Sequence, residues 1–198
     1  LSCTNVLWAS NLPLKLTAAL PLNSRGVYNE DGPSALIFKT IASKLDVKLV
    51  FQKCPWARCI REMANGTAEI MVFVYHSRQR EQILYYFNPP IKKELHDFVF
   101  YENPQKSFSV SSLNSLHGRR VGIVRGNIYF PAIDNNKQII QVPGRITSHL
   151  VDLLAKGRID TFIDLPVSRN QNLKNYEPFK KLRKSTYEHQ VIIEEFVT

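Results

Sequence analysis

A six-residue pattern that occurs twice constrains the fold of this chain more than any other feature. Residues 64–69 read ANGTAE and residues 155–160 read AKGRID. In both copies a glycine is placed to end an apolar helix, and an acid three residues later opens an apolar strand. The repeat indicates two similar lobes; a generic helix-to-strand loop, occurring twice by chance, is the alternative.

The strands that follow the two copies are apolar at nearly every position. Residues 69–75 and 159–164 lack the alternation of a half-exposed strand, so we expect strands covered on both faces of a parallel sheet. Helical periodicity predicts helices at 34–45, 55–65 and 147–156, and further strands are expected at 14–20, 47–53, 120–125 and 138–142. The order β-α-β-α-β in each half predicts parallel sheets with right-handed crossovers.

Two helices carry more specific expectations. Ser34 is expected to cap the first, with Ile37, Ile41 and Leu45 on its buried face. Pro55 is expected to start the second, which would place Trp56 in the core rather than in a cleft.

Two extended segments, residues 94–102 and 188–197, are expected to run between the lobes. The first lobe would then comprise residues 1–95 with 188–198, and the second residues 96–187. Two crossings of this kind form a hinge about which lobes can close.

Composition narrows the functional classes. The chain is 44% hydrophobic and 22% charged, with a formal net charge of +9 over 198 residues. No apolar run reaches the length of a membrane span. The basic residues are scattered and there is no zinc-finger, phosphate-loop or RNA-binding pattern, so nucleic acid is not an expected partner. His76 and His149 lack spaced partners, so neither a metal nor a cofactor is expected.

Three cysteines leave two questions open. Cys54 and Cys59 could form a bridge or remain two buried thiols. The chain begins without methionine, as a processed or trimmed product would, and its first residues, up to Cys3, resemble the end of a bacterial lipoprotein cleavage site. A lipid anchor at Cys3 is therefore an expectation.

Polar residues follow the strand expected at 69–75. Ser77 can cap a new helix, and Arg80 would lie in its first turn beside the free N–H groups. Ligands of open α/β sheets bind outside the carboxyl ends of strands, so we expect the functional site here.

Several local motifs, in this order and spacing, resemble those of extracellular, periplasmic solute-binding proteins of the amino-acid ABC-transporter kind. They are residues 54–58 (CPWAR), 65–69, 77–80 (SRQR), 116–126 (LHGRRVGIVRG) and 157–164 (GRIDTFID). The resemblance covers nearly the whole chain. It implies an α/β, two-lobed periplasmic-binding-protein-like (Venus-flytrap) fold, in which each lobe is a mainly parallel sheet flanked by helices and two crossing strands join them.

The resemblance also implies a binding site. Arg80 would hold a ligand carboxylate, for which a planar guanidinium is suited, and Ser77 would add its hydroxyl and N–H. Asn127, which is expected to cap a short helix carrying residues 128–130 in the second lobe, would meet the same carboxylate at that helix N-terminus. Asp164 would hold the ammonium group.

Aromatic walls and further charge complete this expected site. Tyr28 and Tyr75 could supply apolar or cation-facing walls. Arg25, Arg78 and Arg125, together with Arg80, could enrich the cleft in positive charge and so favour an acidic amino acid.

The expected function is therefore non-enzymatic. A monomeric receptor in the periplasm or outside the cell would close around a small polar solute, most simply an amino acid, and deliver it to an ABC transporter permease. A sensor domain of a membrane receptor kinase and a periplasmic enzyme on the same fold are the alternatives. No acid-base pair or nucleophile motif favours the enzyme.

Overall fold

The first lobe is a small parallel sheet covered by two helices. The computed structural model describes residues 15–166 and 171–198, so Cys3 and its expected lipidation lie outside the described residues. Strands β1 (Lys15–Pro21) and β2 (Lys48–Cys54) pair in parallel, with helix α1 (Pro33–Leu45) between them and α2 (Trp56–Ala64) after them. Ala18 on β1 also bridges Ile70 in parallel, which completes the predicted β-α-β-α-β order.

The second lobe is built on a six-stranded sheet in the order β3-β8-β4-β7-β5-β6. This sheet includes β3 (Val74–Tyr75), β4 (Lys92–Glu102) and β8 (Arg183–Phe196). Strands β5 (Arg120–Val124), β6 (Ile140–Gly144) and β7 (Thr161–Asp164) are parallel, as predicted. The short 3₁₀ helix η1 and helices α4 to α7 accompany them, at Leu113–Leu116, Pro131–Asp134, Thr147–Ala155, Gln171–Lys174 and Glu177–Lys180.

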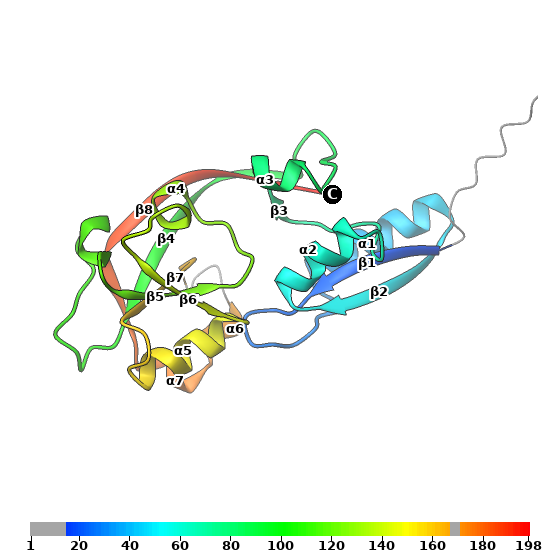
Figure 1. The fold of residues 1–198 in the computed structure, drawn as a ribbon. Coiled ribbons are helices and arrows are strands. Elements are labelled where there is room, and N and C mark those ends of the chain that lie inside the picture. The colour runs from blue at the N-terminus through cyan, green and yellow to red at the C-terminus, as the bar shows by residue number, and fades with distance from the viewer. Residues whose placement is uncertain (1–14, 167–170) are drawn as a thin grey trace, which may run out of the picture.

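Two long strands join the lobes. Strands β4 (Lys92–Glu102) and β8 (Arg183–Phe196) pair antiparallel along almost their whole length and run together between the two lobes (Figure 1). The predicted pair of crossing strands is therefore confirmed. The predicted lobe boundaries, 1–95 with 188–198 and 96–187, stay a prediction, because β4 and β8 continue between the lobes without a break.

The hydrophobic cores follow the lobes. In the first lobe, Phe38 of α1 packs on Ala18 and Leu20 of β1, and in the second, Leu150 of α5 packs with Phe162 of β7. All five side chains are buried. Each lobe thus has an interior of its own, which allows the two to move relative to each other.

Helix α1 differs from the prediction in two details. Its N-cap is Gly32 and its first residue is Pro33, so Ser34 does not cap it; proline's fixed φ and missing N–H suit the first helical position. The fully buried positions are those of Ala35, Phe38 and Ala42. Ile37 and Ile41 are only partly buried, and Leu45 is 48% exposed. Ala35 and Ala42 have small side chains that suit the face of a helix packed against a sheet. A search for large apolar residues at helical spacing does not identify this face.

The strand predicted at residues 69–75 is interrupted. Ile70 pairs with β1, whereas only Val74–Tyr75 form β3, which pairs antiparallel with β8. Phe73 between them has a φ of 58°, a left-handed conformation that is strained for a bulky residue. The chain turns there from the sheet of the first lobe to the crossing strands, and a run that is apolar on both faces hides such a turn.

Cys54 and Cys59 form a disulfide, with their Cα atoms 5.3 Å apart. The bridge joins the last residue of β2 to the first turn of α2. Of the two states that the sequence left open, the structure has the bridged one.

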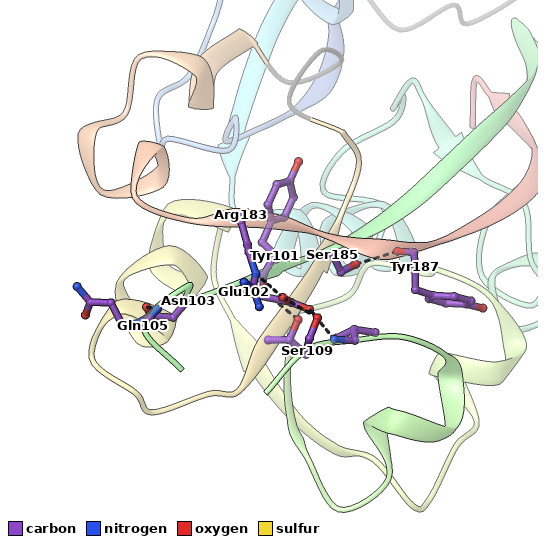
Figure 2. Close-up of polar contacts among 10 residues, drawn as sticks. Tyr101, Glu102, Asn103, Gln105, Ser109, Arg183, Ser185 and Tyr187 are labelled. Atoms are coloured by element: carbon purple, nitrogen blue, oxygen red, sulfur yellow. Dashed lines mark hydrogen bonds and ion pairs between the residues drawn. The ribbon is translucent and has the colours of Figure 1, made fainter. Parts of the chain in front are cut away.

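A buried carboxylate fixes the far end of the crossing strands. The Glu102 side chain, 1% exposed, accepts hydrogen bonds from Ser109 Oγ at 3.0 Å and from Arg183 Nε at 2.9 Å (Figure 2). The Val110 N–H also donates to it. Glu102 thus holds the loop after β4 against β8, and its partners explain its burial.

Candidate ligand-binding site between the lobes

Arg80 is fixed where the two lobes meet, at a boundary called here the seam. Ser77 caps α3 (Arg78–Glu81), as predicted, because its Oγ accepts the Arg80 N–H at 3.2 Å. The Arg80 side chain is 5% exposed and donates from Nη1 to the Tyr75 carbonyl at 2.9 Å and from Nη2 to the Gly126 carbonyl at 2.7 Å. Burial lowers the pKa of this guanidinium from its ordinary value. A cation held in this way is preorganised for an anionic group.

Gly126, in the turn after β5, is one point where the two lobes touch. Its carbonyl accepts the Trp56 Nε1–H at 3.1 Å as well as the Arg80 bond. A Cβ on Gly126, whose φ is +81°, would lie 2.9 Å from Ala57 Cβ. Glycine is required there both by the left-handed backbone and by the close approach of α2.

One pocket at this seam has a volume of about 230 Å³ and is called here the Arg80 pocket. Arg80, Tyr75 and Glu195 line it together with Trp56 and Asn127. The first three come from the first lobe and the crossing strands, and Asn127 comes from the second lobe. A cationic and an anionic side chain therefore face one small space.

The second pocket, of about 180 Å³, is called here the Asp164 pocket. Asp164 and Arg145 are its charged residues, and it shares Trp56 and Asn127 with the Arg80 pocket. This pocket too carries one side chain of each sign. The shared residues make the two pockets neighbours on one seam.

Asp164 ends β7 in a polar setting. Thr147 Oγ1 and the Leu165 N–H each donate to its carboxylate at 2.7 Å. Burial nevertheless raises the pKa of Asp164 to about 6, since two hydrogen bonds do not replace full hydration. A ligand cation would supply the missing compensation, which is the arrangement expected of an ammonium site.

Asn127 does not cap a helix, contrary to the prediction from the sequence. It was predicted to cap a helix carrying residues 128–130, but α4 begins at Pro131 with Phe130 as its N-cap. Asn127 lies instead in a turn in which its N–H donates to the Val124 carbonyl at 3.0 Å. Proline at the first helical position fixes where this helix starts. Asn127 still reaches the seam, without a helix N-terminus behind it.

The other predicted residues lie at different distances from the pockets. Ser77 acts as the cap of α3 and is not among the residues that line either pocket. Tyr28 packs against the core of the first lobe, with Lys53 Nζ 5.8 Å from its ring centroid. Neither pocket is lined by Arg25, Arg78 or Arg125, so these three arginines add no positive charge to the lining of either one.

Three residues of the pockets were missed or misplaced from sequence. Trp56 was expected in the core, yet it is only partly buried and lines both pockets. Glu195 and Arg145 were not singled out. Arg145 directly follows β6, and its position after a predicted strand could have marked it as a candidate site residue. Glu195 lies within the long strand β8, where no sequence pattern distinguishes it.

Two further findings concern only residues 15–166 and 171–198. Among them, no group of three His, Cys, Asp or Glu side chains is placed to hold a metal ion. No helix in the same stretch has both the length and the apolar character that crossing a membrane requires.

Comparison with known proteins rests on structure. No protein-family model matches the chain, and no curated protein matches it in sequence. Solved structures match at full probability. The chain therefore has the two-lobed fold of substrate-binding proteins, and the resemblance to those of amino-acid ABC transporters is confirmed for the fold.

Three similar structures show what this fold carries elsewhere. An amino-acid ABC transporter substrate-binding protein, AbpA from Streptococcus pneumoniae bound to L-arginine, is 17% identical with a TM-score of 0.73, over 91% of this chain and 80% of that one. A histidine kinase sensor domain is 14% identical with a TM-score of 0.72, over 92% and 81%. An ancestral amino-acid-binding protein described as a precursor of cyclohexadienyl dehydratase is 13% identical with a TM-score of 0.68, over 92% and 80%.

Proposed function

We propose that this chain binds a small zwitterionic solute, an amino acid, between its two lobes and delivers it to an ABC transporter permease. The protein would act without catalysis, as a monomer, in the periplasm or outside the cell. The Cys54–Cys59 disulfide supports such a compartment, because disulfides persist in oxidising surroundings.

One observation carries the proposal: each of two adjacent pockets holds one cationic and one anionic side chain. Arg80 and Glu195 face the first pocket, and Arg145 and Asp164 face the second. Such a balance suits a ligand that carries both charges and suits an anion less well. The zwitterionic form is therefore proposed in place of the acidic ligand suggested by the sequence.

The proposed mechanism is closure of the hinge around the ligand. Its carboxylate would accept from the Arg80 guanidinium and its ammonium would donate to Asp164, while Trp56 would form an apolar wall shared by both pockets. Arg80 and Asp164 come from different lobes, so the bound solute stabilises only the closed arrangement. Binding then shifts the population of open and closed forms, which a permease can recognise.

Calorimetric titration with each of the twenty amino acids tests this proposal. Arg80→Gln should weaken binding of the best ligand by at least ~30-fold, because truncating one partner of a buried charge pair costs roughly 2 kcal/mol or more. Arg78→Gln, which removes an exposed arginine of the same helix, is the matched control and should bind as the parent does. Equal affinity in Arg80→Gln would remove this residue from the site.

Binding should also depend on pH through Asp164. The pKa of this half-buried carboxyl is raised to about 6, so below pH 6 the free protein holds it neutral and its attraction for an ammonium is lost. Affinity should fall by up to about tenfold per pH unit below that point. Asp164→Asn should bind weakly at pH 7.5 and show a flat profile, and an unchanged slope in this variant would assign the dependence to another group.

The sensor role is the second candidate, since a histidine kinase sensor domain shares this fold with a TM-score of 0.72. Uptake of the radiolabelled ligand by cells lacking the gene separates the two roles. A transporter subunit predicts a loss of uptake, and a sensor predicts normal uptake. Mass spectrometry of the ligand after prolonged incubation with the protein addresses the enzymatic alternative, for which an altered mass would be the positive result.

A further inference from the structure

A third pocket on the seam is lined by positive charge from both lobes and is called here the basic pocket. Its volume is about 350 Å³. Helix α2 contributes Arg58 and Arg61, and the second lobe contributes Arg125, Arg145 and His149. It lies apart from the Arg80 pocket, with which it shares no lining residue.

The charges of the basic pocket are not balanced within it. Its lining contains no aspartate or glutamate. Within the described part of the chain, Arg58 alone among its four arginines has an ion pair, to Glu62 at 2.9 Å. Arg61, Arg125 and Arg145 are exposed. Four guanidinium groups around one small space repel one another, and the repulsion acts across the seam, against closure.

The backbone adds to this positive potential. Helices α2 and α5 begin at the basic pocket, each nine residues long, and neither has a side-chain cap or an acid in its first turn. Their dipoles therefore place partial positive charge beside the arginines. Guanidinium groups prefer oxyanions that accept two parallel hydrogen bonds, as phosphate and carboxylate groups do.

We propose that the basic pocket binds a small multivalent oxyanion, of phosphate or polycarboxylate type, that bridges the two lobes and favours their closure. The anion would turn the repulsion between Arg61 of the first lobe and Arg125 of the second into attraction through a shared counter-charge. It would do so outside the Arg80 pocket and beside the Asp164 pocket, with which the basic pocket shares Arg145.

Binding of the anion should be coupled to binding of the amino acid. The two sites adjoin, since Arg145 lines both the basic pocket and the Asp164 pocket. If both ligands stabilise the closed form, each raises the affinity for the other by the same factor. This coupling rests on the proposed function, whereas binding of the anion does not.

The test uses pyrophosphate and citrate as probes, titrated by calorimetry into the whole chain at a constant ionic strength set with sodium chloride. Saturable 1:1 binding is expected. Arg61→Gln combined with Arg125→Gln should weaken it by ~10-fold or more, because each lost charge-assisted hydrogen bond is a large share of the affinity. Lys44→Gln combined with Lys48→Gln removes the same charge from exposed positions elsewhere in the first lobe and should leave it unchanged.

Three outcomes are decisive. No saturable binding of either probe beyond the effect of chloride overturns the proposal, and so does an equal loss in the lysine control, which would indicate net charge alone. Loss confined to the arginine variant supports it. The amino-acid affinity measured with and without pyrophosphate then tests the coupling, and binding of the amino acid without anion binding would leave the proposed function standing while this inference fails.

Discussion

The two lobes use the same carboxylate device at the turn from helix to strand, with one difference. In the first lobe, Glu69 Oε2 accepts the Thr17 N–H at 2.7 Å, which ties the new strand to the start of β1. In the second lobe, Asp160 Oδ2 accepts the Arg120 N–H at 2.8 Å at the start of β5, and Asp160 Oδ1 also accepts Arg120 Nη2 at 2.7 Å. The repeat seen in the sequence therefore has a structural role: its acid ties two strands together in each lobe. In the second lobe an ion pair with Arg120 adds to this contact.

The strand-to-helix junctions differ more. Where β2 meets α2, the first lobe has the Cys54–Cys59 disulfide. Where β6 meets α5, the second lobe has Gly144 packed so closely on Leu150 that an added Cβ would lie 2.5 Å from its Cδ2. The first lobe fixes this junction by a covalent bond and the second by close packing. The same β-α-β-α-β arrangement is therefore compatible with either.

Replacing Asp160 or Glu69 should give the largest loss of stability, and the loss should differ between the two lobes. Asp160→Ala should lower the free energy of unfolding by about 2–3 kcal/mol, and Glu69→Ala by about 1.5–2 kcal/mol, because both remove a charged hydrogen-bond acceptor and only the first also leaves an arginine without its carboxylate. Urea unfolding at pH 7 measures both. A larger loss in Glu69→Ala would contradict the assigned role of Arg120.

The same ion pair predicts a dependence on pH. Hydrogen bonding by Arg120 lowers the pKa of Asp160 in the folded state, so the unfolded state binds the proton more tightly. The contribution of Asp160 is then complete above its ordinary pKa near 4 and is lost as the pH falls through the lower folded value. The difference in unfolding midpoint between the parent and Asp160→Asn should shrink between pH 7 and pH 2.5, and a constant difference would exclude this linkage.

The disulfide gives the next effect. Replacing both cysteines by alanine should lower the free energy of unfolding by about 2 kcal/mol, because the bridge closes a short loop and restricts the unfolded chain little. Thermal unfolding of the parent with and without reductant offers an independent measurement. The parent under reduction and the double variant should agree, and disagreement would show that the alanines alter packing as well.

The smallest effect should be equal in the two lobes. Gly66 and Gly157 have φ values of +71° and +66°, and their N–H groups donate to Met63 and Leu154 at 3.0 Å, so both end their helices in the left-handed form. Alanine at either position meets no neighbour and should cost only the strain of that backbone, about 1 kcal/mol. Unequal losses, measured by urea unfolding, would show that one glycine has a role beyond the helix end.

Much of the fold could be predicted because its signals are local. Hydrophobic periodicity and the repeated glycine-to-acid pattern placed the three longest helices, α1, α2 and α5, and most strands to within a few residues. The break at Phe73 could not be predicted, since both of its flanks are apolar and the turn serves a distant pairing with β8. The caps expected at Ser34 and Asn127 failed because a nearby proline, Pro33 or Pro131, decides where the helix starts.

The candidate site was predicted less completely. Of the residues predicted for the site, Arg80, Tyr75, Asn127 and Asp164 line the two seam pockets. Asn127 and Asp164 come together because β5 and β7 are neighbouring parallel strands whose carboxyl ends meet at one edge of the sheet. Glu195 reaches the Arg80 pocket through the antiparallel pairing of β8 with β3, a contact between segments far apart in the chain. Periodicity carries no information on such a contact.

The pairing at Met71 has a consequence for how the protein is made. The Met71 N–H donates to the Thr198 carbonyl at 2.8 Å, and the Thr198 N–H donates back at 2.9 Å, so the sheet of the first lobe gains a neighbour from the far end of the sequence. On a ribosome, the edge beside Met71 emerges first and waits on the order of ten seconds at ordinary elongation rates. During that interval an unpaired strand edge is open to other nascent chains, while every strand of the second lobe's parallel core is translated before the partner of Met71 arrives.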